Sequence, residues 1–364
     1  MVQANRQGAI EKLNAIIEKG RGRTMTALTE IEAEWQSRRD IIVPAKRMQF
    51  EVDDTGIHPV ALMEKENRRF DLTPHSHVQV LERSGIPKQF ADKLQKLGEV
   101  DLLQHNLMTL FRRVSSGGVL VRHVDNRIKG FLSTAYKPMD ASPIFEGLAT
   151  EALGRGFVPY RGLNTDTRMS ATFLWPNVYE PKTGEFVVYG ISQTTGDYGG
   201  VANTLELMAL RIWCDNLMLG FDMMRKIHIG KRFNGEENVI ELSRKTHELD
   251  TATVVSATKD AVKSAIGYFE PLNGAITAAA DREPDVAATL KTLGKKGLKK
   301  EVLEQVEKTY AMEMPIEALP QGKSAWRLSN VLSLIAKSHE GDAKVDLESA
   351  AFDVLGIDKL QTAA

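Results

Sequence analysis

Residues 115–138 read SSGGVLVRHVDNRIKGFLSTAYKP and predict a β-hairpin. Valines precede a turn at Asp125-Asn126, and apolar residues resume directly after it. After this hairpin, the alternation of apolar and polar residues predicts more strands, at 156–161, 168–176 and 185–192. Alternating β and α units, which a doubly wound parallel sheet requires, are not evident. The sequence therefore predicts an α+β fold with an antiparallel β core flanked by N- and C-terminal helical regions.

Three regions follow from this pattern. Residues 1–45 predict a helical N-terminal arm, residues 46–234 the α+β core, and residues 235–364 a helical C-terminal region. Thr73 followed by proline predicts a capped helix start inside the core. Residues 205–224 are apolar throughout, so their periodicity does not decide between strand, helix, or one leading into the other.

Composition excludes several classes of protein. The chain has 364 residues and a net charge of −1, which excludes a uniformly basic, histone-like protein. A single cysteine excludes a disulfide framework and any multi-cysteine zinc or iron–sulfur site. The sequence has no secretory signal and no apolar run that could span a membrane, so the expected location is the cytoplasm of a bacterial host.

Catalytic and metal-binding patterns are weak. Cys214 and His228 could form a nucleophile–base pair, but the apolar sequence around Cys214 favours a buried structural thiol. His75 and His77 could share one face of a strand and bind a metal, whereas a helix would separate them. The preceding proline favours the helix. We therefore expect no catalytic residue, metal or cofactor, with a Cys214/His228 hydrolase as the minor alternative.

Basic residues interleaved with aromatic residues give the stronger signal. Between residues 111 and 234 basic residues outnumber acidic ones by 15 to 11, although the whole chain is slightly acidic. Such a surface can follow a phosphate backbone while aromatic rings stack on bases, although a solvated sheet face is an equal alternative. Arg122 and Arg127 are expected to contact phosphates and Tyr136 to stack. The full set of candidate nucleic-acid-binding residues is Arg122, Arg127, Lys129 and Tyr136, with Lys226, Lys231 and Arg232 as a second group.

Four blocks of the sequence resemble a known family. They are LTPHSHVQVLERSGIPKQF, VLVRHVDNRIKGFLSTAYKPMD, GDYGGVANTLELMALRIWCDNLML with IHIGKR, and SAWRLSNVLSLIA. Together, over residues 70–340, they resemble the phage/plasmid-like proteins, a mobile-element family catalogued as a domain of unknown function. The most specific parts are LSTAYKP and the spacing of Arg211, Cys214 and Asn216. The resemblance implies a role in the DNA metabolism of a phage or plasmid.

The expected architecture is also similar in outline to phage single-strand annealing proteins of the Red-beta and Erf types. Those proteins form rings or filaments and bind single-stranded DNA without catalytic residues. This similarity leads us to expect a homo-oligomer that binds single-stranded DNA, with strand annealing as its extension. The basic run Gly294–Lys300 is either a solvated loop or a further nucleic-acid contact.

Two alternatives are a protein-binding module that acts on a host defence factor and a structural, oligomeric phage protein that binds no nucleic acid. The first would use an exposed apolar stripe on the N-terminal arm. The stripe consists of Ile10, Leu13, Ile16, Leu28, Ile31 and Trp35. The same stripe could instead pack on the core of the protein.

Overall fold

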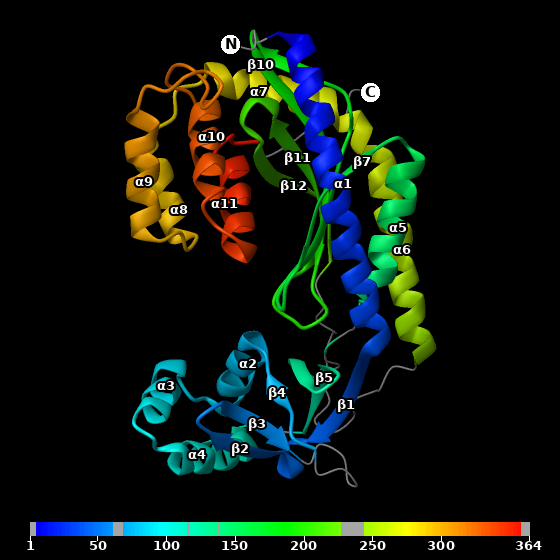
Figure 1. The fold of residues 1–364 in the computed structure, drawn as a ribbon, viewed down its shortest axis with the longest axis vertical. Helices are drawn as coiled ribbons and strands as arrows, with labels where there is room; N and C mark the ends of the chain where they lie inside the picture. Colours follow the sequence, from blue (N-terminus) through cyan, green and yellow to red (C-terminus); the bar gives the residue numbers. More distant parts are fainter. Residues whose placement is uncertain are drawn as a thin grey trace, which may run out of the picture.

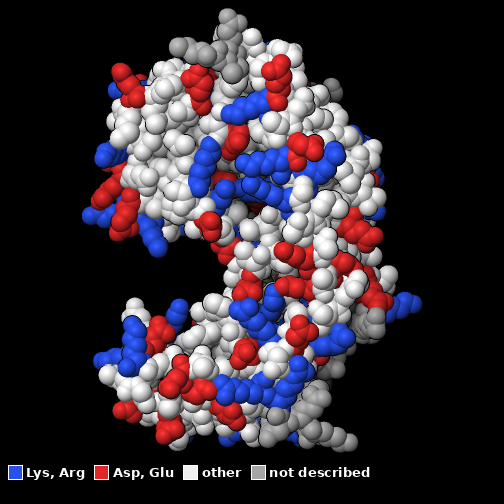
Figure 2. All heavy atoms as spheres, in the orientation of Figure 1, with Lys and Arg blue, Asp and Glu red and all other residues white. Residues whose placement is uncertain are grey.

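Two lobes separated by an open cleft make up the molecule (Figures 1 and 2). The computed structural model describes residues 5–60, 68–114, 117–134, 136, 139–226 and 244–357. The small lobe comprises the described residues between 38 and 136, and the large lobe comprises the rest. The chain passes between the lobes twice, after Ser37 and again before Met139. The predicted α+β class is confirmed, with antiparallel sheets and helices at both ends of the chain.

A six-stranded sheet forms the centre of the large lobe. Its hydrogen-bonded order is β12-β11-β10-β8-β7, with β9 paired to β10, and every pairing is antiparallel. The strands are β7 (Val158–Asn164), β8 (Met169–Leu174), β9 (Tyr179–Lys182), β10 (Glu185–Thr195), β11 (Asn203–Arg211) and β12 (Asn216–Lys226). The strands predicted after the hairpin are thus present. The ambiguous stretch 205–224 is two strands joined by a 3₁₀ turn, Ile212–Cys214, because Asp215 adopts a left-handed conformation with φ of 50°.

One long helix, α1 (Arg6–Ser37), lies along one face of this sheet (Figure 1). Leu13, Ile16 and Ile31 are buried, so the centre of the apolar stripe packs on the core and is not available to a partner helix. The contact with β7 is close. A Cβ placed on Gly20 would lie 2.3 Å from the carbonyl oxygen of Tyr160, and one on Gly162 would lie 2.5 Å from the Cβ of Ala27.

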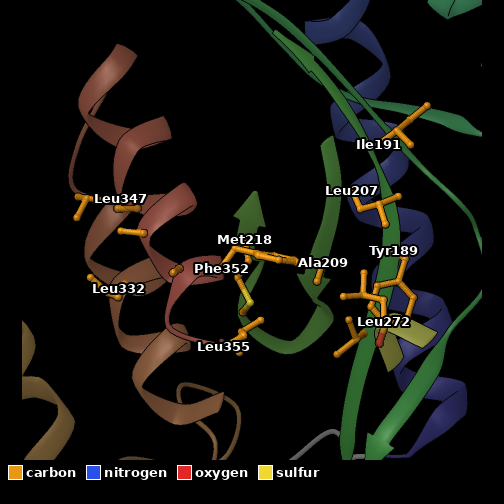
Figure 3. Packing of buried hydrophobic residues seen from close by; sticks show 14 of the residues in the cluster. Tyr189, Ile191, Leu207, Ala209, Met218, Leu272, Leu332, Leu347, Phe352 and Leu355 are labelled. Atoms are coloured by element: carbon orange, nitrogen blue, oxygen red, sulfur yellow. The ribbon is translucent and has the colours of Figure 1, made fainter. Parts of the chain in front are cut away.

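The C-terminal helices and α5 pack on the sheet mainly in another apolar cluster, separate from the one that contains Leu13 and Ile16. Apolar side chains of β10–β12, such as Tyr189 and Met218, share one cluster with Leu272, Leu332 and Phe352 from three helices (Figure 3). Besides α1, the helices of the large lobe are α5 (Ala141–Gly154), which precedes the sheet, and the C-terminal α6 (Arg244–Ala265), α7 (Phe269–Asp281), α8 (Val286–Lys295), α9 (Lys300–Ala311), α10 (Ala325–Ala336) and α11 (Gly341–Asp353), with a 3₁₀ turn at Ile266–Tyr268. None of the helices within the described residues is long and apolar enough to cross a membrane.

The small lobe has its own core beneath a four-stranded sheet. The strand order is β1-β5-β6-β4, and β2 and β3 form a separate pair. The strands are β1 (Arg38–Pro44), β2 (Gln49–Asp53), β3 (Gly56–Val60), β4 (Asp71–Leu72), β5 (Gly118–Val124) and β6 (Arg127–Ser133). A 3₁₀ turn (Ala45–Arg47) follows β1, and the helices are α2 (Pro74–Ser84), α3 (Lys88–Lys96) and α4 (Val100–Val114). The predicted hairpin and the Thr73 cap are both present.

The hydrophobic cores divide the chain differently from the boundaries predicted at residues 45 and 235. The sheet and the C-terminal helices share one apolar cluster, whereas the small lobe has a separate cluster. Residues 38–44 are also a strand and not part of a helix. The β-branched residues Ile41, Ile42 and Val43 favour that conformation, and they pair in antiparallel register with β5.

A pair of glycine substitutions in α1 tests its packing on β7. Gly20→Ala should destabilise the protein by about 1–3 kcal/mol, because the new methyl group meets strand backbone that cannot rotate away. Gly22→Ala has open space around it and should stabilise by up to about 1 kcal/mol through helix propensity. The measurement is urea unfolding followed by circular dichroism. Equal stabilisation by both variants would contradict the packing.

Candidate nucleic-acid interface

Arg122 of the predicted hairpin site is fully buried in the structure. It lies on β5 directly opposite Asp40 of β1. Its Nε and Nη2 donate to the two carboxylate oxygens of Asp40 at 2.9 and 2.8 Å, and its Nη1 donates to the carbonyl of Asp197 at 2.7 Å. The side chain is 0% exposed. The expectation that Arg122 contacts phosphate is therefore wrong in this conformation, because every face of the guanidinium is used inside the protein.

The other hairpin residues divide between the lobe junction and solvent. Lys129 forms ion pairs with Glu34 and Asp166, and its Nζ lies 5.3 Å from the ring centre of Tyr198. Tyr136 donates from its hydroxyl to the carbonyl of Gly196 at 3.3 Å, and the guanidinium of Arg122 lies 5.7 Å from the centre of its ring. The Tyr136 ring is therefore engaged within the protein, which disfavours the predicted stacking role. Arg127 alone of the four is exposed and makes no ion pair with described residues.

The second predicted group is mostly outside the described residues. Lys231, Arg232 and His228 lie outside them. Lys226 ends β12, and nothing is described of its side chain. The Cys214/His228 pair and the second phosphate-contacting group therefore stay predictions.

The glycine-rich segment at 194–200 connects the lobes. The carboxylate of Asp197 accepts hydrogen bonds from Arg38 at 2.8 Å and from the backbone N–H of Ala141 at 3.0 Å. Burial raises the pKa of Asp197, against the neighbouring charges of Arg38 and Arg122. Asp197 thus contacts Arg38 through its carboxylate and Arg122 through its carbonyl, and these contacts hold the segment between the two lobes.

Small-lobe side chains hold the same loop from the other side. Both Gln79 and His75 have side-chain nitrogens within 3.1 Å of the carbonyl oxygen of Tyr198. His75 and His77 lie on α2, so they do not share a face as they would in a strand. Burial lowers the pKa of His77. No group of three metal-ligating side chains occurs among the described residues.

The block containing Arg211, Cys214 and Asn216 fixes α10 to the end of the sheet. Arg211 is fully buried and forms two hydrogen bonds with Glu185, at 2.6 and 2.9 Å. The side-chain amide of Asn216 donates to the backbone carbonyl of Asn330 at 3.1 Å. Cys214 is partly exposed, with its Sγ 3.2 Å from Nη1 of Arg211. The expected burial of Cys214 is wrong, because the strand turn carries it to the edge of the core.

A larger concentration of positive charge lies elsewhere, between α1 and the α10–α11 pair (Figure 2). We call it the basic face. Its members come from distant parts of the chain, and sequence analysis missed it. They are Lys12, Lys19 and Arg23 on α1, Lys337 at the end of α10, and Lys344 on α11.

Helical spacing and packing bring these residues together. Lys12, Lys19 and Arg23 are separated by seven and four residues, which places them on one side of α1. The close contact at Gly20 sets that side beside Tyr160 of β7, whose hydroxyl is influenced by the charges of Arg23 and Arg161. The charges of Lys12 and Lys344 in turn act on Lys337.

Other cations on this side of the lobe are neutralised. Arg161 forms two hydrogen bonds with the carboxylate of Glu348, at 2.7 and 2.6 Å, and Arg168 pairs with Asp346 at 3.1 Å. The five cations of the basic face form no ion pair with any described residue. They therefore leave uncompensated positive charge on this surface, which favours an anionic ligand.

The pKa shifts of two residues on or beside the basic face, Lys337 and Tyr160, bear on how it would meet an anion. Burial is the main cause that lowers the pKa of Lys337; the like charges of Lys12 and Lys344 act in the same direction, and Cys214 and Asp215 oppose it. Burial also raises the pKa of Tyr160 to about 12, so its hydroxyl is a neutral donor at pH 7. An anion on this face would meet several cations and one hydroxyl.

Comparison with known proteins adds no relative. No protein-family model matches the chain, and neither the curated proteins nor the solved structures contain a match.

Two hairpin arginines distinguish a structural role from a surface role. Arg122→Gln should lower the free energy of unfolding by about 3–5 kcal/mol, because it leaves Asp40 without its partner beside the lobe junction. Arg127→Gln, at the exposed start of the other hairpin strand, β6, should change it by no more than about 0.5 kcal/mol. Denaturant unfolding measures both. A small effect of Arg122→Gln would show that the buried pair does not hold the junction.

Proposed function

We propose that this chain binds nucleic acid through its phosphate backbone on the basic face, and that the bound nucleic acid is single-stranded DNA. The observation that supports this proposal is the convergence on one surface of five cations from three helices that form no ion pair with described residues, although Lys12 donates to the carbonyl of Trp213. Unpaired Lys and Arg side chains that are already close together repel one another, and a polyanion relieves that repulsion while releasing its own counterions.

The extent of the basic face favours a polymer over a small anion. Lys12 and Arg23 are eleven residues apart, a distance of about 16 Å along a helix at about 1.5 Å per residue. Lys337 and Lys344 lie on the opposite side of the same face. A strand with phosphates at regular intervals can contact both sides at once, whereas one phosphate group cannot.

The choice of single-stranded DNA rests on the resemblance to phage/plasmid-like proteins and on the outline shared with single-strand annealing proteins. A role in phage or plasmid DNA metabolism, annealing of complementary strands and homo-oligomer formation are further parts of this proposal. The alternative of a protein-binding module loses its main support, because the centre of the α1 stripe is buried.

Charge reversal on the basic face tests the proposal. The variant K12E/K337E/K344E should weaken binding to a fluorescent thymidine oligonucleotide by about tenfold or more. It should also reduce the slope of log affinity against log salt by about 2, since each lost phosphate contact on a single strand contributes about 0.7. Fluorescence anisotropy across a salt series gives both values.

A matched control has the same change in net charge. Lys88, Lys93 and Lys96 lie exposed on α3 of the small lobe, so K88E/K93E/K96E alters long-range attraction equally. It should leave the salt slope unchanged. Equal weakening by both triple variants would show that only the total charge matters. Full-strength binding by K12E/K337E/K344E would refute the basic face as the site.

A further inference from the structure

A shallow depression of about 330 Å³ lies between α2 and β6 of the small lobe. It is formed by Gln79, Glu82, Arg83, Phe131, Leu132 and Ser133. The depression borders the lobe junction, because Gln79 also donates to Tyr198 of the large lobe and Leu132 contacts Gly199. Its volume is at the lower end of the range for small-molecule sites, which is about 300–1,000 Å³.

Arg83 is the unusual member of this depression. Its Nε donates to the carbonyl of Phe131 at 3.1 Å, which fixes the plane of the guanidinium. No carboxylate among the described residues forms an ion pair with it. Burial lowers the pKa of Arg83, and no neighbouring charge counteracts that effect. A half-buried cation without a counterion is costly, so a bound anion would be stabilising.

The surrounding contacts hold the arginine in place. Gln79 accepts a hydrogen bond from the backbone N–H of Phe131 at 2.7 Å, one turn before Arg83 on α2. Gln79 and Arg83 of α2 therefore both hydrogen-bond to the backbone of Phe131 on β6. These contacts fix the position of the guanidinium before a ligand binds. Such preorganisation favours binding, because no ordering of the arginine is then required.

We propose that this depression binds a phosphate group through the Nη1 and Nη2 groups of Arg83. The two outer amino groups of a guanidinium match two oxygens of a phosphate. The exposed Glu82 at the rim repels any anion, so the contacts with Arg83 must outweigh that repulsion. This site lies in the other lobe from the basic face and uses none of its residues, so it is independent of the proposed function.

The phosphate could belong to a free nucleotide or to a nucleic-acid strand, and three probes distinguish these sources. They are inorganic phosphate, thymidine monophosphate and a thymidine oligonucleotide. Binding is followed by the ¹H–¹⁵N signal of the Arg83 Nε–H and by calorimetry, in the wild-type chain and in K12E/K337E/K344E. The triple variant removes the basic face, so failure of one site is distinguishable from failure of the other.

Arg83→Gln should weaken binding of at least one probe by about tenfold or more, since it removes both charge-assisted contacts with the phosphate. Arg83→Lys keeps the charge but lacks the two parallel donors of a guanidinium, so its affinity should lie between those of the wild-type protein and Arg83→Gln. Arg155→Gln is the matched control, because Arg155 borders another shallow depression but already pairs with Glu151 at 2.5 Å.

Loss of monophosphate binding in Arg83→Gln would support a nucleotide site, and loss only with the oligonucleotide would support contact with a strand. Unchanged affinity for all three probes in a folded Arg83→Gln protein would overturn the proposal. Acetate binding as tightly as phosphate would also overturn it, because the ligand class would then be wrong.

Discussion

The close approach of α1 to β7 is the constraint on which the arrangement of this molecule depends. Gly20 and Gly162 leave no room for side chains where the helix crosses the strand. That contact fixes both the depth and the rotation of a 32-residue helix on the sheet. Because the rotation is fixed, Lys12 and Arg23 face the α10–α11 pair and not open solvent on the far side. The basic face is therefore a consequence of backbone packing in addition to residue composition.

The same helix determines where the small lobe sits. Ser37 ends α1 and Arg38 begins β1 without an intervening linker. The two lobes have separate apolar clusters, so their junction depends mainly on buried polar contacts of Arg38, Arg122 and Asp197. Buried ion pairs contribute less to stability than apolar packing of similar size, but a pair that loses one partner is costly. Such a junction restricts the two lobes to geometries in which each charge keeps its partner.

Features that depend on residues close together in the chain were predicted well, whereas contacts between residues far apart in the chain were not. The hairpin turn at Asp125, the Thr73 cap and the antiparallel strands all depend on residues close together in the chain. The role of Arg122 depends on Asp40, which is 82 residues earlier. In the sequence Arg122 is one of several basic residues near aromatic ones, and nothing local distinguishes a buried pair from a phosphate contact.

The basic face could not be found by counting charges along the chain. Its members extend from Lys12 to Lys344, and all five lie outside the segment 111–234 with the basic excess. The heptad-like spacing of Lys12, Lys19 and Arg23 was a usable local signal, because it predicts one charged side of a helix. Only the fold shows that Lys337 and Lys344 face the same side. The Arg83 depression likewise depends on a carbonyl 48 residues away.

Lysine footprinting tests the central claim most directly. The protein is treated with an amine-reactive reagent, with and without a single-stranded oligonucleotide, and the modified lysines are identified by mass spectrometry. If the basic face binds the strand, Lys12, Lys19, Lys337 and Lys344 become protected while Lys88, Lys93 and Lys96 on α3 stay reactive. Equal protection of both sets, or protection of α3 alone, would contradict the account.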